Sequence, residues 1–114
     1  MRMLLGAMLA TTFVASPSTA ADRAGYRAIA AGDFATAARQ IEAERRIFPQ
    51  RPELMLNLAV AYARMGRSAE ASTLYRQVLD RPVVAMDLPD GSVVSSHDIA
   101  TRGLSRLSTE IATR

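Results

Sequence analysis

The sequence predicts a mostly α-helical fold, in which two helical hairpins (an α-solenoid fragment) are followed by a short β-hairpin and a C-terminal closing helix. Two stretches match at an offset of 34 residues, with Gly32 recurring as Gly66 and Ala37 as Ala71. An offset of this size indicates a supersecondary unit copied in tandem. Apolar residues recur within both copies at the three- and four-residue spacing of an amphipathic helix. The stretch after the second copy is instead β-prone and contains a turn sequence.

The N-terminal residues 1–20 have the layout of a secretory signal peptide. A positive charge precedes the uncharged and mostly apolar segment 3–15, and the small residues Ser18 and Ala20 suit cleavage near Ala20–Ala21. The alternative is a retained membrane anchor, which needs an apolar run of about 18 residues or more. Because this run is shorter, we expect an exported bacterial protein, periplasmic or secreted, with no stable membrane span after cleavage.

The first helical hairpin is expected over residues 21–51. Asp22 can cap a helix that extends to about Ala31, where Gly32 interrupts the helical pattern. A second helix is expected over residues 34–47, because its apolar residues lie on one face.

The second helical hairpin is expected over residues 52–82. Pro52 is tolerated at a helix start, because the N–H that proline lacks would be unpaired there. The helix from Pro52 to Met65 has the clearest apolar stripe in the chain, and Gly66 suits a left-handed C-cap. Ser68 can cap the fourth helix.

Residues 83–95 are expected to form a β-hairpin or loop, since two valine-rich stretches flank the turn sequence at 89–92. Ser95 with Asp98 three residues later can cap a last helix over residues 96–114. We expect this helix to cover the open face of the second hairpin with one apolar stripe, which consists of Ala100, Leu104, Leu107 and Ile111.

Residues 21–82 resemble the tetratricopeptide repeat (TPR) family, whose fingerprint is W-x₂-L-G-x₂-Y, then A-x₃-F, then P. In the second copy the matching residues are Leu58, Ala59, Tyr62, Ala71, Tyr75 and, one residue early, Pro82. In the first, more degenerate copy they are Ala24, Gly25, Ala28, Ala37, Ile41 and Pro49. The small residues would allow close helix approach, Gly25 facing Ala37 and Ala59 facing Ala71.

In the TPR family the first helix of each pair lines a concave groove that receives a peptide or a partner helix. The resemblance places on this groove Asp22, Arg23, Tyr26, Glu53, Leu56, Asn57, Val60 and Arg64. An amide such as that of Asn57 both donates to and accepts from a peptide backbone, although it can equally be solvated or bond within its own repeat. The resemblance implies a non-catalytic protein- or peptide-binding adaptor or scaffold in the cell envelope. The alternative is a structural subunit that uses the 83–94 hairpin for strand addition.

No residue pattern predicts catalysis, a cofactor or a metal site. Ser95, His97 and Asp98 are too close in sequence for their side chains to converge as a catalytic triad. The single histidine lacks further metal ligands nearby, and the chain contains no cysteine. Its arginines and acidic residues are interspersed along the chain, and the net charge is only +3. A nucleic-acid interface would show clustered basic residues, so we do not expect one.

Overall fold

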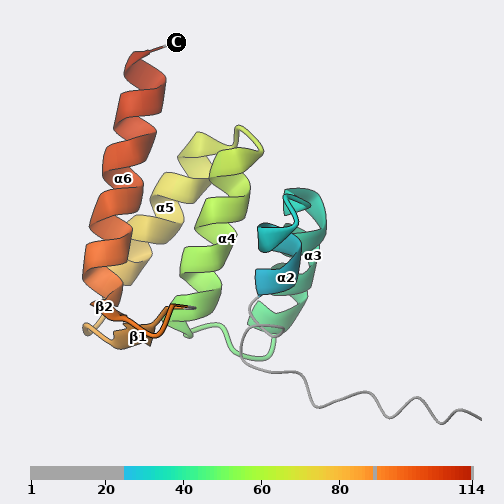
Figure 1. The fold of residues 1–114 in the computed structure, drawn as a ribbon, viewed down its shortest axis with the longest axis vertical. Coiled ribbons are helices and arrows are strands. Elements are labelled where there is room, and N and C mark those ends of the chain that lie inside the picture. The colour runs from blue at the N-terminus through green and yellow to red at the C-terminus, as the bar shows by residue number, and fades with distance from the viewer. Residues whose placement is uncertain (1–24, 89, 114) are drawn as a thin grey trace, which may run out of the picture.

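The computed structural model describes residues 25–88 and 90–113, which form five helices and one two-stranded hairpin (Figure 1). In chain order the elements are α2 (Tyr26–Ala30), α3 (Phe34–Arg45), α4 (Pro52–Arg64), α5 (Ser68–Leu79), β1 (Ala85–Asp87), β2 (Val93–Ser95) and α6 (Ser96–Ala112). The predicted fold class is confirmed. The expected signal peptide at residues 1–20 lies outside the described residues. None of the helices in the described ranges is long and apolar enough to span a membrane.

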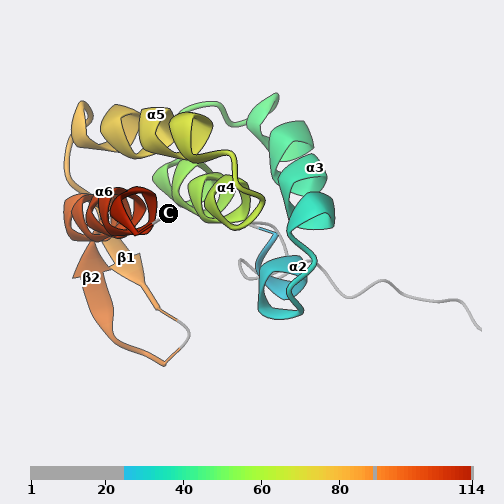
Figure 2. The same ribbon diagram turned by 90° about the horizontal axis from the view of Figure 1, so that it is seen from above.

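The helices lie in two layers (Figure 2). Helices α2, α4 and α6 form one layer, and α3 and α5 form the other. Within the helical hairpins α2 packs on α3 and α4 packs on α5, while α4 also packs on α3. Helix α6 packs on both α5 and α4, so it occupies the place that the first helix of a third pair would take. The predicted closing role of the C-terminal helix is therefore confirmed for Ala100, Leu104 and Leu107, whereas Ile111 is 57% exposed because it lies in the last turn of the helix.

The two hairpins share the same glycine turn, which accounts for the 34-residue offset. Gly32 and Gly66 have φ angles of 78° and 80°, in the left-handed region that residues with a Cβ atom avoid. In each copy the N–H after the glycine donates to the carbonyl five residues earlier, at 2.9 Å for Asp33 and 2.8 Å for Arg67. This is the hydrogen bond of a Schellman C-cap, and it ends α2 and α4 in the same way.

Two helix starts differ from the prediction. Gly25 does not lie inside the first helix, because its φ of 68° is left-handed and makes it the N-cap of α2. Ser68 is not a cap either: the N-cap position of α5 belongs to Arg67, and Ser68 is already helical. Arg67 directs its side chain to Glu70, with Nε 2.8 Å from Oε1, so an ion pair occupies this first turn.

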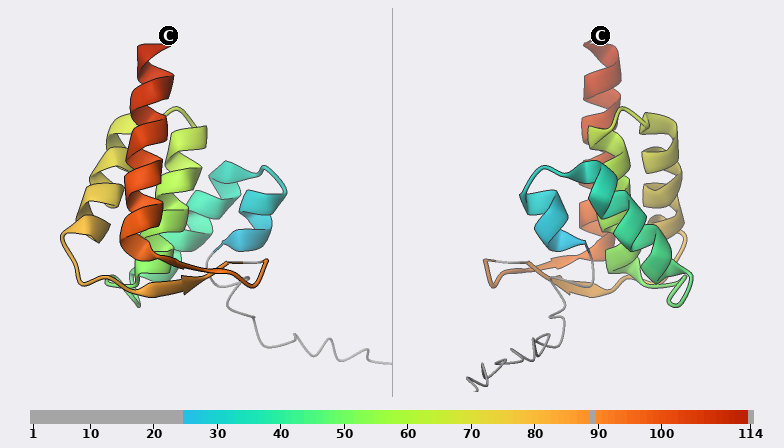
Figure 3. Two further views of the ribbon diagram at one scale, coloured as in Figure 1. Left: turned by 60° about the vertical axis from the view of Figure 1, so that its left-hand side comes forward. Right: turned by 90° about the vertical axis from the view of Figure 1, so that its right-hand side faces the viewer.

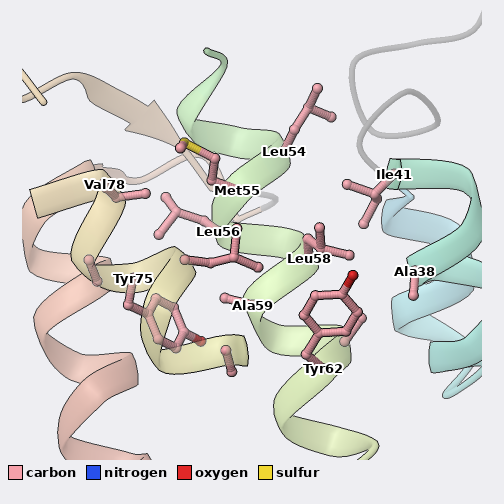
Figure 4. Close-up of a cluster of buried hydrophobic side chains, with 14 of the residues drawn as sticks. Ala38, Ile41, Leu54, Met55, Leu56, Leu58, Ala59, Tyr62, Tyr75 and Val78 are labelled. Carbon is pink, nitrogen blue, oxygen red and sulfur yellow. The ribbon is translucent and has the colours of Figure 1, made fainter. Parts of the chain in front are cut away.

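The hydrophobic core is centred on α4 (Figure 4). Seven of its residues are buried, namely Leu54, Met55, Leu56, Leu58, Ala59, Ala61 and Tyr62. Leu58 and Tyr62 point toward α3, whereas Met55 and Leu56 point toward α5 and α6. A helix with buried residues on most of its circumference holds both neighbouring pairs together, so α4 is the central element of the fold.

Small residues permit the close helix contacts that the sequence predicts. A Cβ atom on Gly25 would lie 3.4 Å from the carbonyl oxygen of Ala37 and 2.8 Å from Cγ1 of Ile41. Ala59 and Ala71, on the paired helices α4 and α5, are both completely buried. Larger side chains at these sites would require the helices to separate.

The β-hairpin is joined to the start of α6 by backbone and side-chain hydrogen bonds. Ser96 is fully buried; its N–H donates to the carbonyl of Val84 at 2.8 Å, and its Oγ accepts from the N–H of Val84 at 2.9 Å. Ser95 Oγ accepts from the N–H of Asp98 at 3.0 Å, which confirms the predicted cap. Figure 3 shows the hairpin crossing one end of the helical layers.

Candidate partner-binding surface

One face of α4 carries partly exposed side chains, in contrast to its buried remainder. Glu53, Asn57, Val60 and Arg64, here called the α4 stripe, recur at intervals of three or four residues and so share one helix face. The first three are half-buried and Arg64 is exposed. Because the other faces of α4 are buried against α3, α5 and α6, the α4 stripe lies on the outer side of the layer formed by α2, α4 and α6.

Leu56, which the family resemblance places in the groove, does not line this surface. Its side chain is only 3% exposed and belongs to the core. The physical reason is α6, which packs against α4 and covers the side of the helix toward which Leu56 points (Figure 4). The closing helix therefore removes one of the expected contact residues from the surface.

Of the residues that the resemblance places on the groove from the first hairpin, the structure describes only Tyr26. Tyr26 is half-buried on α2, a five-residue helix that contacts α4. Asp22 and Arg23 lie outside the described residues. Asn57 already has an interaction partner, so it is not a free recognition group.

Arg64 is held at its position by an aromatic ring of the neighbouring hairpin. Its guanidinium carbon lies 5.7 Å from the centroid of the Phe34 ring at the start of α3. A guanidinium within about 6 Å of a ring face is attracted by the ring quadrupole. The charge at this end of the α4 stripe is therefore oriented while it stays open to solvent.

A polar cluster that the sequence does not reveal lies on the opposite face of α4. The Tyr62 hydroxyl donates to Glu42 Oε1 at 2.5 Å, and the Arg67 guanidinium lies 4.0 Å from the centroid of the Tyr62 ring. Burial and this hydrogen bond to Glu42 raise the pKa of Tyr62 to about 12. The phenol therefore keeps its proton at neutral pH and does not act as a base there. Its contacts tie α3 to α4, and the two partners are 20 residues apart in sequence, so no local pattern indicated them.

The residues around His97 have structural roles. His97 Nε2 lies 2.7 Å from the carbonyl oxygen of Arg81, to which it donates because a carbonyl only accepts. Ser95 caps α6 and Ser96 binds the hairpin, so these side chains do not converge on a common point. In the part of the chain that the structure describes, no three His, Asp or Glu side chains lie close enough to hold a metal ion.

Comparison with known proteins gives one result. The model of the tetratricopeptide repeat family matches residues 28–82, which include part of α2 and all of α3, α4 and α5. No curated protein and no solved structure matches the chain. Repeats of this family generally mediate protein–protein interactions, and its members are typically non-catalytic. The paired helices and the two equivalent glycine turns agree with this match, so residues 28–82 are similar to the tetratricopeptide repeat family.

Proposed function

We propose that the protein is a non-catalytic adaptor or scaffold of the bacterial cell envelope, which binds a protein or peptide on the layer formed by α2, α4 and α6. The observation that carries this proposal is the α4 stripe. It is the partly exposed face of the most deeply buried helix, so its side chains are presented on a rigid support. Rigid presentation reduces the entropy that binding costs.

The charged and apolar side chains of the α4 stripe indicate which groups a bound segment would need in order to match it. Glu53 and Arg64 lie eleven residues apart on α4, which at 1.5 Å per residue is roughly 16 Å. The half-buried Val60 lies between them and provides an apolar contact. A helical or extended segment with a basic group near Glu53, an acidic group near Arg64 and an apolar side chain between them would match this surface. Such charge complementarity fixes the direction in which a segment binds.

The β-hairpin limits the surface at one end. It projects beyond the layer of α2, α4 and α6 (Figure 2) and lies at the same end of the molecule as the start of α4 (Figure 1). A segment bound along the α4 stripe would meet the hairpin near Glu53. We therefore infer that the hairpin limits how far a bound segment extends past Glu53.

The envelope location rests on residues 1–20, whose short apolar run and small residues have the layout of a cleavable signal peptide. N-terminal sequencing of protein recovered from the periplasmic fraction tests it. A mature chain that begins at Ala21 or Asp22 is the expected result, and an intact Met1 on cytoplasmic protein would contradict the proposed location.

Photo-crosslinking tests the binding surface. A benzophenone amino acid at Val60, in the centre of the α4 stripe, is expected to capture a defined partner in the periplasm. The matched control places the same amino acid at Thr73, an exposed position of α5 in the other layer. Identical products from both positions, or none above background at Val60, would contradict the proposal.

A second candidate function is strand addition by the hairpin, which specific features favour. Val83 and Val93 are 60% and 62% exposed, and each strand has an open edge within the described residues. The register pairs Asp87 with Val93, between the hydrogen-bonded pairs Met86–Val94 and Leu88–Ser92. Since paired residues in an antiparallel ladder alternate, the backbone groups of Asp87 and Val93 point outward, where another strand could bind them.

A further inference from the structure

Exposed apolar side chains gather at one end of the molecule. Five of the seven large apolar side chains that are exposed among residues 25–88 and 90–113 belong to segments at the end where α4 and α6 start (Figure 1). They are Ile47, Phe48, Val83, Val84 and Val93. The other two, Met65 and Ile111, lie at the opposite end, where α4 and α6 finish. Single exposed apolar side chains are common, whereas a group of them marks an interaction surface.

Four of the five belong to two neighbouring segments. Residues 45–51 end α3 and form the loop before α4, and residues 80–84 join α5 to β1. Residues from both segments line a common depression between the C-terminal ends of α3 and α5. We call the two segments together the basal patch. The fifth side chain, Val93, lies in the hairpin, which projects from the other side of the helical layers (Figure 2).

The loop of the basal patch holds its apolar side chains in place. Ile47 is 71% exposed, yet its N–H and that of Phe48 both donate to the carbonyl of Glu44 at 3.0 Å. The guanidinium carbon of Arg51 lies 3.8 Å from the centroid of the Phe48 ring, which is a cation–π contact. An ordered loop therefore presents Ile47 to solvent, next to an arginine that is paired with an aromatic ring.

The charges of the basal patch are predominantly positive. It contains four arginines and one acidic residue, and the balance stays positive when the adjoining Glu44 is counted. The arginines are Arg45, Arg46, Arg51 and Arg81, and the acidic residue is Asp80. The negative ends of the α3 and α5 dipoles lie here, but the positive ends of α4 and α6 lie at the same end of the molecule and offset them (Figure 1). The basal patch therefore attracts a negatively charged surface.

An anionic lipid surface matches both features of the basal patch. Apolar side chains enter the boundary between the head groups and the acyl chains, while arginines are attracted to anionic lipids. A guanidinium can also bind two oxygens of a lipid phosphate at once. Because the buried apolar area and the electrostatic attraction add, a surface that has both binds more strongly than a surface that has only one.

The course of the chain brings this end of the molecule toward a membrane. Helix α2 also starts here (Figure 3), so residues 1–24 join the fold at this end. Their apolar segment 3–15, either as a signal peptide during export or as a retained anchor, would hold the basal patch close to the bilayer. We propose that the basal patch docks on an anionic lipid surface, with the Ile47 side chain in the interface and the flanking arginines near the lipid phosphates. This docking does not depend on partner binding by the α4 stripe, which lies along the side of the molecule.

Tryptophan fluorescence tests the docking, because the chain contains no tryptophan. Ile47→Trp places a single reporter in the basal patch, and Ile111→Trp is the matched control, exposed at the opposite end of the molecule. The full-length variants are reconstituted into vesicles of phosphatidylcholine and phosphatidylglycerol whose brominated acyl chains quench a tryptophan in contact with them. At equal amounts of vesicle-bound protein, we expect blue-shifted emission and quenching by more than half for Ile47→Trp, and neither for Ile111→Trp.

Charge variants in the Ile47→Trp protein test whether anionic lipid is required. Omission of phosphatidylglycerol, or the change Arg46→Gln, is expected to reduce the quenching at least twofold. The matched control Arg102→Gln removes the same charge from an exposed position of α6 and should leave the quenching unchanged. If Ile47→Trp fails to fold by circular dichroism, Val83→Trp, at another exposed position of the basal patch, carries the test.

Four outcomes would overturn the proposal. They are the absence of vesicle binding or of quenching at the basal patch, equal quenching in Ile111→Trp, quenching that persists in full without phosphatidylglycerol, and a blue shift that needs no vesicles but rises with protein concentration. The last of these would show that a second copy of the chain covers the basal patch.

Discussion

The ring of Tyr75 on α5 lies directly against Gly103 of α6: a Cβ atom on residue 103 would be 2.2 Å from Cζ of that ring. The ring cannot simply move aside, because Tyr75 is only 4% exposed within the core. A glycine inside a helix costs about 1 kcal/mol relative to alanine. The close approach of α6 to α5 therefore depends on a residue that is unfavourable for the helix itself.

Gly103→Ala is expected to destabilise the protein despite its better helix propensity. The gain of about 1 kcal/mol in propensity is set against the forced separation of α6 from Tyr75, since an overpacked core typically costs about 1–3 kcal/mol. Because the clash is severe, the free energy of unfolding should fall. Urea denaturation followed by circular dichroism measures it, with Ser105→Ala at an exposed position of α6 as control. A stabilised Gly103→Ala would contradict the close packing of these two helices.

Ala71→Leu is expected to lower the free energy of unfolding by about 1–3 kcal/mol, because extra methyl and methylene groups have no space in a packed core. Ala71 is completely buried on α5, the partner helix of α4. The control is Ala69→Leu, two positions earlier on the same helix and exposed, which should change stability by less than about 0.5 kcal/mol. Equal melting temperatures of the two variants would argue against the pairing of α4 with α5.

The raised pKa of Tyr62 predicts that the protein loses stability at high pH. Its pKa is raised to about 12 in the folded protein, first by burial and then by the hydrogen bond to Glu42. An unfolded tyrosine loses its proton near pH 10, so between about pH 10 and 12 the folded state binds more protons than the unfolded state. The free energy of unfolding therefore decreases as pH rises through this window.

The Tyr62→Phe variant tests that assignment, since it removes the titrating phenol but keeps the ring under Arg67. Urea midpoints measured from pH 8 to pH 12 should fall less steeply for Tyr62→Phe than for the unmodified protein. Burial also raises the pKa of Tyr75, so Tyr75→Phe measures the second contribution separately. A pH dependence that does not change in Tyr62→Phe would show that this residue does not couple folding to pH.

Local sequence patterns predicted the elements better than their contacts. The glycine turns, the cap of α6 by Ser95 and the apolar face of α4 each involve residues within a few positions of one another. These features can therefore be predicted from the local sequence. Gly103 was not singled out, because nothing near it in the sequence reveals the ring of Tyr75.

The candidate sites likewise combine features that local spacing predicts with features that depend on distant parts of the chain. Spacing alone places Glu53, Asn57, Val60 and Arg64 on one face of a helix. The burial of Leu56 depends on α6, which begins 40 residues later in the chain, so no local pattern reports it. The depression between the C-terminal ends of α3 and α5 likewise joins two different repeats, so no local motif marks it.

Two substitutions distinguish binding by the α4 stripe from strand addition by the hairpin. Arg64→Glu reverses an exposed charge at one end of the stripe and removes its contact with the Phe34 ring. Val93→Pro removes an outward-pointing backbone donor of β2 without removing a hydrogen bond of the hairpin ladder.

If the α4 stripe binds the partner, Arg64→Glu should reduce capture by crosslinking at least tenfold, while Val93→Pro leaves it unchanged. Strand addition predicts the reverse, because an added strand needs that N–H and does not contact Arg64. Circular dichroism must first show that both variants keep their helices. Loss of capture in neither variant would place the partner on another surface and would contradict both functions.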